Sequence, residues 1–140
     1  MSVRYFLDTN LFVYGLDPAS PTKAAIALKL IREGITGRKG VISFQVVQEF
    51  FNVAFRRFPT RMTTPEAERF LANVLRPLLA VHSTTALYGE ALRLRSTLKF
   101  CWYDSLMVSA ALQAKCGILY TEDLQHGQKI GSLQIVNPFL

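Results

Sequence analysis

The chain has little cysteine, which argues against a disulfide framework or a zinc site. Cys101 and Cys116 are the only two cysteines among 140 residues, and they do not form a Cys-x-x-Cys pair. Disulfide-stabilised domains and structural zinc sites need more thiols, or further ligands at short spacing. We therefore expect both cysteines to be reduced thiols of the core.

The sequence also lacks long apolar runs. No segment approaches the ~20 consecutive apolar residues of a membrane-spanning helix. The N-terminal apolar run stops at Asp8, too early for a signal peptide. Repeats, low-complexity tracts and linkers are absent as well, and half of the residues are hydrophobic, enough for an ordinary core. We expect one globular domain over residues 1–140, in the cytoplasm and without membrane contact.

Aspartate is scarce, so the positions of the few aspartates are informative. They stand at 8, 17, 104 and 123. The chain as a whole is basic, with 16 Lys and Arg against 10 Asp and Glu and a net charge of +6. Such a surface attracts polyanions, and nucleic acid is the partner that we expect. A cationic surface that serves only solubility is the alternative.

Short apolar runs alternate with helical patterns along the chain. Strands are expected at 3–7, 40–43, 79–82, 118–120 and 133–136. Helices are expected at about 21–33, 44–58, 64–75, 85–98 and 103–115, with residues 8–10 as a polar turn. This alternation predicts an α/β fold, a three-layer α/β/α architecture with a central, mostly parallel five-stranded sheet.

The predicted fold brings four scattered carboxylates to one edge of the sheet. Asp8 and Asp123 follow the first and fourth strands, and Asp104 begins the helix that precedes the fourth. All three therefore lie at the carboxyl edge, where open α/β sheets bind ligands. Glu49 lies between one and two turns into the helix after the second strand, and its longer side chain reaches the same place.

Clustered carboxylates raise one another's pKa, and a divalent cation removes this conflict. Hard oxygen ligands favour Mg²⁺ or Mn²⁺ over softer metals. Such an ion lowers the pKa of a bound water and offsets the charge of an attacked phosphate, so phosphodiester hydrolysis is the natural reaction. Asn10 and Thr121 would support the site by orienting the carboxylates through hydrogen bonds.

Each acid also has a structural interpretation. Asp104 alone could cap a helix, Asp8 and Asp123 could be turn residues, and Glu49 could be a solvated helix position. Glu49 argues against this interpretation, because its neighbours are Val46, Val47, Phe50, Phe51 and Val53.

Two further features have a functional and a structural interpretation. His126 could contact a phosphate or be an ordinary surface histidine. The basic segment 56–61 could follow a nucleic-acid backbone or serve only solvation.

The chain resembles the PIN-domain nucleases, and most closely the VapC-type toxins of bacterial toxin–antitoxin pairs, over its whole length. The resemblance rests on the Phe6-Leu7-Asp8-Thr9-Asn10 opening, Glu49 in its helix, Tyr103-Asp104-Ser105 and Leu119-Tyr120-Thr121-Glu122-Asp123. It implies an acidic quartet of Asp8, Glu49, Asp104 and Asp123, supported by Asn10 and Thr121. It also implies RNA cleavage dependent on Mg²⁺ or Mn²⁺, a homodimer, and inhibition by an antitoxin protein. Glu122 could share the role of Asp123.

Three other functions are alternatives to this one. A haloacid-dehalogenase-like phosphatase needs a second aspartate two residues after the first, where this chain has Asn10. A response-regulator receiver needs paired acids after the first strand and an aspartate after the third, where His82 and Ser83 stand. A non-catalytic RNA-binding or partner-binding module would keep the basic surface without using the acids. Metal-dependent turnover distinguishes it from a nuclease.

Overall fold

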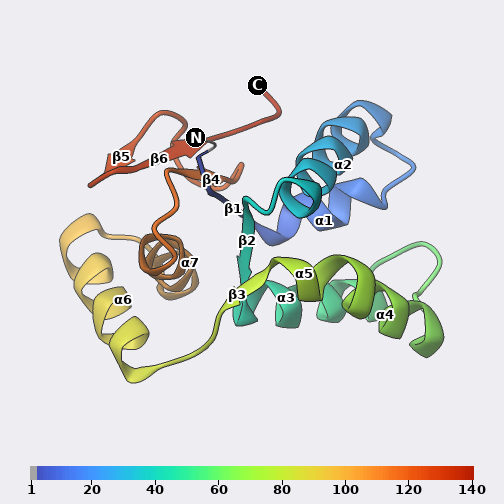
Figure 1. Cartoon of the computed structure of the whole chain (residues 1–140), viewed down its shortest axis with the longest axis horizontal. Helices are drawn as coiled ribbons and strands as arrows, with labels where there is room; N and C mark the ends of the chain where they lie inside the picture. The colour runs from blue at the N-terminus through green and yellow to red at the C-terminus, as the bar shows by residue number, and fades with distance from the viewer. Residues whose placement is uncertain (1–2) are drawn as a thin grey trace.

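A computed structural model of the chain describes residues 3–140. Six strands form one sheet in the order β3-β2-β1-β4-β6-β5 (Figure 1). The strands are β1 (Tyr5–Leu7), β2 (Gly40–Ser43), β3 (Leu79–Val81), β4 (Ile118–Tyr120), β5 (Lys129–Ile130) and β6 (Leu133–Val136). β1 lies between β2 and β4 and pairs with both in parallel, so residues just after β1 and β4 emerge side by side.

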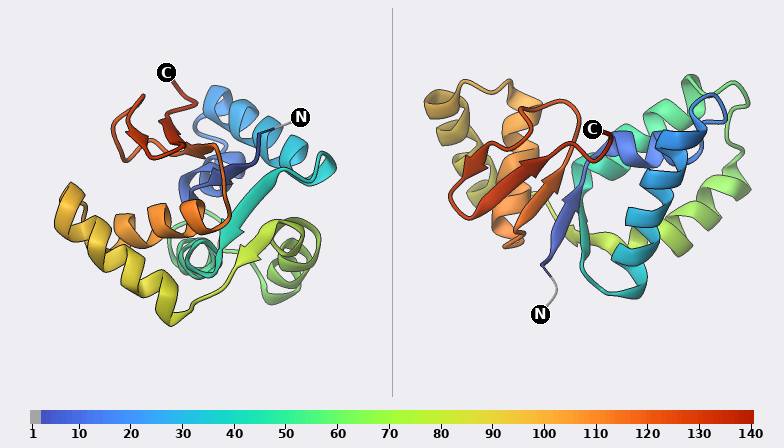
Figure 2. Two further views of the ribbon diagram at one scale, coloured as in Figure 1. Left: turned by 60° about the vertical axis from the view of Figure 1, so that its left-hand side comes forward. Right: turned by 90° about the horizontal axis from the view of Figure 1, so that it is seen from above.

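Helices cover both faces of the sheet. They are α1 (Thr9–Gly15), α2 (Pro21–Thr36), α3 (Phe44–Arg56), α4 (Thr64–Phe70), the π-helical turn η1 (Leu71–Leu75), α5 (Arg76–Leu78), α6 (Thr85–Leu98) and α7 (Trp102–Gln113). Helices α1 to α5 lie on one side, and α6 and α7 pack together on the other (Figure 1; Figure 2). Right-handed crossovers produce this division, because the chain moves outward from β1 to β3 and then crosses back to β4.

The predicted fold class is confirmed, with one more strand than expected. β5 pairs antiparallel with β6 across a turn at Gly131, whose φ of +60° suits a residue without a side chain. The two residues of β5, one exposed and one buried, are too few to show the alternation of a strand. The sequence pattern therefore did not reveal it.

The expected polar turn at residues 8–10 is instead the start of helix α1. Asp8 is the N-cap, in extended conformation, and its carboxylate accepts a hydrogen bond from the backbone N–H of Thr9. Leu11 and Phe12 are buried on the inner side of α1. An aspartate shortly before a buried apolar pair is typical of a helix N-terminus. The turn prediction was wrong because it considered only the polar residues 8–10 and not the apolar pair that follows them.

The helix that begins at Thr64 continues past its expected end at residue 75. Its predicted capping box is present, with Thr63 and Glu66 satisfying each other's backbone N–H groups. Pro77 lies inside the last helical segment, α5, and cannot donate the usual i to i−4 hydrogen bond. The chain accommodates it by widening into the π-helical turn η1 just before, where the N–H of Arg76 bonds to the carbonyl of Leu71.

Helix α2 also runs further than expected, to Thr36 instead of residue 33. The glycines at 34 and 37 predict the end of this helix; Gly37 is its C-cap, but Gly34 is buried inside the helix, where α2 meets Gly40 at the start of β2. A Cβ atom built on Gly40 would lie 2.9 Å from the Cα of Gly34, closer than packed atoms allow. The two glycines therefore permit helix and strand to touch.

The core is centred on strands β1, β2 and β4 and on the inner residues of α3 and α7. Phe50 of α3 is completely buried, and its ring meets the rings of Phe12, Phe58 and Phe70 within 6.3 Å. This aromatic cluster fixes the rotation of α3 about its axis. Because successive helical residues are turned by about 100°, Glu49 then lies at the border of the buried face.

The two cysteines differ from each other in exposure. Both are free thiols; Cys116 is buried as expected, but Cys101 is exposed. Its prediction as a core thiol was wrong because Cys101 is the N-cap of α7, in the turn that joins α6 to α7. Among residues 3–140, no helix is both long and apolar enough to cross a membrane.

Candidate functional site

A pocket of about 180 Å³ opens at the carboxyl edge of the sheet, and all four predicted acids line it. The acids come from four places in the chain: the end of β1, the second turn of α3, the first turn of α7 and the segment after β4. The lining consists of Asp8, Thr9, Asn10, Gln45, Glu49, Val53, Tyr103, Asp104, Met107 and Asp123.

Asp8 is the most buried of the four acids, with 6 % of its surface exposed. Its two carboxylate oxygens accept hydrogen bonds from the backbone N–H of Thr9 at 2.6 Å and from the hydroxyl of Thr121 at 2.7 Å. Burial is the largest influence on this group and raises its pKa to about 7. The charges of Asp123 and Glu49 also raise the pKa, whereas the two hydrogen bonds lower it. Burial in this pocket therefore disfavours a charge on Asp8 that a cation would stabilise.

Glu49 reaches the pocket from α3 and is half-buried. The hydroxyl of Thr9 donates a hydrogen bond to its Oε1 at 2.9 Å. Thr9 therefore connects two predicted acids, since its N–H bonds to Asp8 and its hydroxyl bonds to Glu49.

Asp104 lies in the first turn of α7, but it does not cap that helix. Cys101 holds the N-cap position, and its side chain makes no capping bond. The structural interpretation of Asp104 as an N-cap is therefore wrong. Its neighbour Tyr103 is tied to α3, because the side-chain amide of Gln45 donates to the Tyr103 carbonyl at 3.1 Å. This bond links the acids of α3 and α7 through the backbone.

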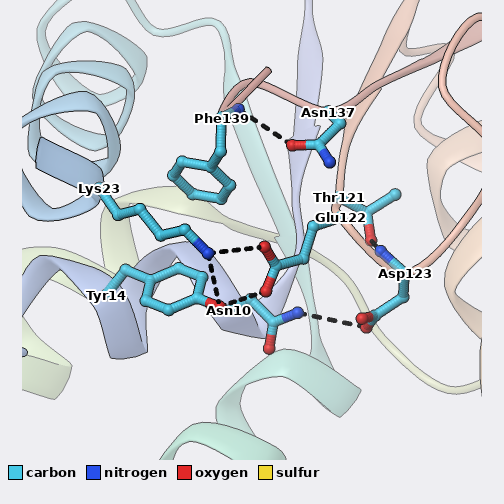
Figure 3. Close-up of polar contacts among 8 residues, drawn as sticks. All are labelled: Asn10, Tyr14, Lys23, Thr121, Glu122, Asp123, Asn137 and Phe139. Atoms are coloured by element: carbon cyan, nitrogen blue, oxygen red, sulfur yellow. Dashed lines mark hydrogen bonds and ion pairs between the residues drawn. The ribbon is translucent and has the colours of Figure 1, made fainter. Parts of the chain in front are cut away.

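Asp123 and Glu122 point to different sides of the segment that leaves β4 (Figure 3). Asp123 faces the pocket, where the amide of Asn10 donates to its Oδ2 at 3.2 Å. Glu122 turns away and accepts hydrogen bonds from the Tyr14 hydroxyl and, at 3.3 Å, from the Lys23 ammonium. Only Asp123 of this pair lines the pocket.

The hydroxyl of Thr121 ties the two ends of the site together. It donates to Asp8, and it accepts a hydrogen bond from the backbone N–H of Asp123 at 3.1 Å, which Figure 3 draws. Thr121 is fully buried. Its position therefore fixes the segment after β4 relative to the end of β1.

The carboxylates share a pocket, and those of Asp8, Glu49 and Asp123 each accept a hydrogen bond from a neighbouring donor. In the part of the chain that the structure describes, no three Asp, Glu, His or Cys side chains are grouped so that they could hold one metal ion as they stand. Negative charges without a counter-ion repel one another and turn toward hydrogen-bond donors. Here those donors are the side chains of Thr9, Asn10 and Thr121.

The donor set of the pocket nevertheless fits a hard cation. Its charged groups are carboxylates, the ligands that Mg²⁺ and Mn²⁺ prefer. The Oε1 of Gln45, also in the lining, is buried without a hydrogen-bond partner among the described residues. A buried polar atom without a partner is costly, and a further donor or a cation in the pocket would satisfy it.

Two other predicted contacts lie outside the pocket. His126 accepts a hydrogen bond at Nδ1 from the backbone N–H of Asn137 at 3.0 Å and is not part of the lining. None of the residues 56–61 lines the pocket. Sequence reasoning did not single out Thr9, Gln45 and Tyr103 as lining residues. A pattern did exist for Gln45, because Gln45, Glu49 and Val53 repeat at four-residue spacing on one face of α3.

The family model of the PIN domain matches residues 5–129. The chain therefore belongs to the PIN-domain family, which confirms the resemblance. No curated protein matches the chain.

Several solved structures share the fold along most of the chain. One is FitAB bound to the IR36 DNA fragment, with a TM-score of 0.73, 17% identity, and coverage of 97% of this chain and 96% of that chain. VapBC2 from Rickettsia felis, bound to a promoter DNA fragment, has a TM-score of 0.62, 19% identity and coverage of 94% and 96%. VapC20 from Mycobacterium tuberculosis, a toxin that cleaves the sarcin-ricin loop, has a TM-score of 0.60, 20% identity and coverage of 85% and 89%.

Proposed function

We propose that this protein is a metal-dependent endoribonuclease that acts as the toxin of a toxin–antitoxin pair. The observation that carries the proposal is the gathering of Asp8, Glu49, Asp104 and Asp123 in one pocket at the carboxyl edge of the sheet. Chance does not readily bring four acids together from separate segments of a chain with a net charge of +6. Their mutual repulsion costs stability, which is typical of a functional site.

The four carboxylates are the proposed metal ligands, with Mg²⁺ or Mn²⁺ as the cofactor. A bound ion would supply a water of lowered pKa and offset the negative charge that develops on an attacked phosphate. Thr9, Asn10 and Thr121 hold the carboxylates of Glu49, Asp123 and Asp8 in place by hydrogen bonds. Asn10 and Thr121 are thus the supporting residues of the proposed site, and Thr9 joins them.

The proposed substrate and partners follow from the family and from the similar structures. RNA is the proposed substrate because the family resemblance implies it, VapC20 is a toxin that cleaves the sarcin-ricin loop, and the basic surface attracts polyanions. The family resemblance implies an antitoxin protein as partner, and the similar VapC20 is a toxin. A homodimer and a cytoplasmic location complete the proposal.

The test is cleavage of total cellular RNA by the purified protein, with Mg²⁺ and with a chelator, followed by sequencing of the new RNA ends. New ends should appear at defined positions with Mg²⁺ and disappear with the chelator. Asp8→Asn should abolish them, whereas Asp17→Asn should not. Asp17 is a matched control because its carboxylate accepts a local hydrogen bond from the backbone N–H of Ala19 and lies outside the pocket.

Equal cleavage with and without chelator would refute the metal-dependent mechanism. Binding of RNA without any cleavage in Mg²⁺ or Mn²⁺ would instead favour a non-catalytic RNA-binding module of the same fold.

A further inference from the structure

A second concavity of about 630 Å³ lies where α6 ends and α7 begins. Its lining combines two cationic side chains with two aromatic rings. The residues are Arg95, Ser96, Lys99, Phe100, Cys101 and Trp102. We call it the Trp102 pocket. It contains no acidic side chain, in contrast to the pocket of the four carboxylates.

The charges of the Trp102 pocket are not neutralised by the protein itself. Arg95 and Lys99 form no ion pair with a carboxylate anywhere in residues 3–140, although the neighbouring Arg93 pairs with Glu90. The turn after α6 brings the two cations together. Lys99 adopts a left-handed conformation with φ of 62°, and its N–H bonds back to the carbonyl of Arg95 at 3.2 Å.

The aromatic part of the pocket is held in place. Trp102 is half-buried against the core, and its ring stacks on Tyr88 with centroids 6.4 Å apart and planes 21° apart. A fixed ring loses little further conformational entropy when a ligand stacks on it.

The Trp102 pocket is adjacent to the candidate active site. Trp102 lines the first and Tyr103 lines the second, so consecutive residues of α7 connect the two. Their Cα atoms are about 3.8 Å apart across one peptide bond. Tyr103 is 63% exposed between them and offers a further ring. A flexible polymer positioned over the carboxylates would therefore pass the Trp102 pocket on one side.

We propose that the Trp102 pocket is a subsite for single-stranded RNA next to the cleaved bond. Arg95 and Lys99 bind the phosphate backbone, and a neighbouring base stacks on Trp102. This inference rests on the proposed nuclease function, whose substrate it places on the α6–α7 side of the active site.

The combination of groups favours RNA over an acidic peptide. Single-stranded nucleic acid is bound by a positive groove for the phosphates together with aromatic rings for the bases. An acidic peptide would use the two cations but would gain less from the rings. A negative dipole end at the α6 C-terminus also attracts cations, but it does not explain the aromatic lining.

The chain contains one tryptophan, so its fluorescence reports on this pocket directly. The probe is an unstructured oligouridylate, added to the full chain in chelator so that no cleavage occurs. A base stacked on the ring should quench Trp102 emission in a saturable manner. The same titration, repeated over a series of salt concentrations, gives the affinity and its salt dependence.

The charge test uses two double variants that remove the same charge. Arg95→Gln with Lys99→Gln should weaken oligouridylate binding about tenfold and reduce the slope of log affinity against log salt by about 1.4, at ~0.7 per phosphate contact. The control is Arg32→Gln with Arg38→Gln. Arg32 is an exposed residue of α2, and Arg38 has a left-handed φ of 54°, close to that of Lys99. Both lie near the start of β2, at the opposite edge of the sheet.

Three results would overturn the subsite: no quenching by oligouridylate, equal weakening by the two double variants, or quenching by polyglutamate at the same concentration. The last result would assign the pocket to an acidic protein segment.

The subsite and the proposed function fail separately. Cleavage of cellular RNA without quenching removes the subsite alone. Quenching with the predicted salt effect but no cleavage retains the RNA site and removes the nuclease.

Discussion

Replacing Asp8 with asparagine should abolish RNA cleavage and, in chelator, stabilise the fold. The side chain is nearly isosteric, so packing at the end of β1 is preserved. The charge at Asp8 is what changes. Burial raises the pKa of this carboxyl from 3.8 to about 7, which means that the folded state holds its proton more tightly than the unfolded chain.

The sign and size of the effect follow from this difference. An acid with a raised pKa destabilises the fold as pH rises, with no cost below about 3.8 and the full cost above about 7. At about 1.4 kcal/mol per pKa unit, the full cost is roughly 4 kcal/mol. Asparagine avoids this cost, but its side chain has one acceptor oxygen, whereas the carboxylate offers one oxygen to Thr9 and one to Thr121. One hydrogen bond is therefore lost, at a cost of about 1 kcal/mol. We expect a net gain of roughly 2–3 kcal/mol at pH 8.

Urea unfolding of both proteins in chelator, at several pH values from 5 to 8, measures this gain. The advantage of Asp8→Asn over the wild type should grow by roughly 2–3 kcal/mol across that range. Saturating Mn²⁺ should reverse the order by stabilising only the wild type. A difference between the two proteins that does not change with pH would refute the burial argument. Normal cleavage by the variant in Mg²⁺ would remove Asp8 from the active site.

The other acids and the α2–β2 contact give further tests. Glu49→Gln should suppress cleavage and weaken Mn²⁺ binding measured by calorimetry, with little change of Tm in chelator; unchanged metal affinity would leave it as a solvated helix residue. Asp104→Asn should also lose cleavage, at a cost within ~1 kcal/mol because it does not cap α7, and unfolding of this variant would make its role structural. Asp123→Asn should lower activity at limiting Mg²⁺ and recover partly at high Mg²⁺, while Glu122→Gln stays mild; kinetic titrations with the opposite ranking would exchange their roles. Gly40→Ala should destabilise the fold by roughly 1–3 kcal/mol in urea unfolding, because its Cβ would meet α2, and wild-type stability would show that α2 shifts freely.

The sequence predicted the edge of the sheet where the acids meet because topology decides that edge. Once β1, β2 and β4 are recognised as parallel, the residue after each strand must lie at the carboxyl edge. Asp8 and Asp123 needed no further information. Glu49 required only its distance from the start of α3. The buried neighbour Phe50 then fixes the rotation of the helix and so the direction of Glu49.

The details that could not be predicted depend on contacts between distant segments. Nothing local indicates that Glu122 pairs with Lys23, 99 positions away, or that Gln45 bonds to the backbone of Tyr103. The length of α2 was misjudged for the same reason. A glycine inside a helix normally weakens it, but Gly34 is needed because the chain at Gly40 comes too close for a side chain.

The arrangement of charge links the proposed chemistry to the stability of the fold. Among residues 3–140, Asp8, Glu49 and Asp123 accept hydrogen bonds from Thr9, Asn10 and Thr121, and none of the four carboxylates is paired with Lys or Arg. A basic side chain within the pocket would lower the free-energy cost of ionising the buried Asp8. It would also occupy the place of a metal ion and repel that ion. Neutral donors orient the acids without satisfying their charge. The ion pair between Glu122 and Lys23 lies on the other side of the segment after β4, outside the pocket. The fold thus retains an unfavourable negative charge at the one place where a cation and a phosphate would meet.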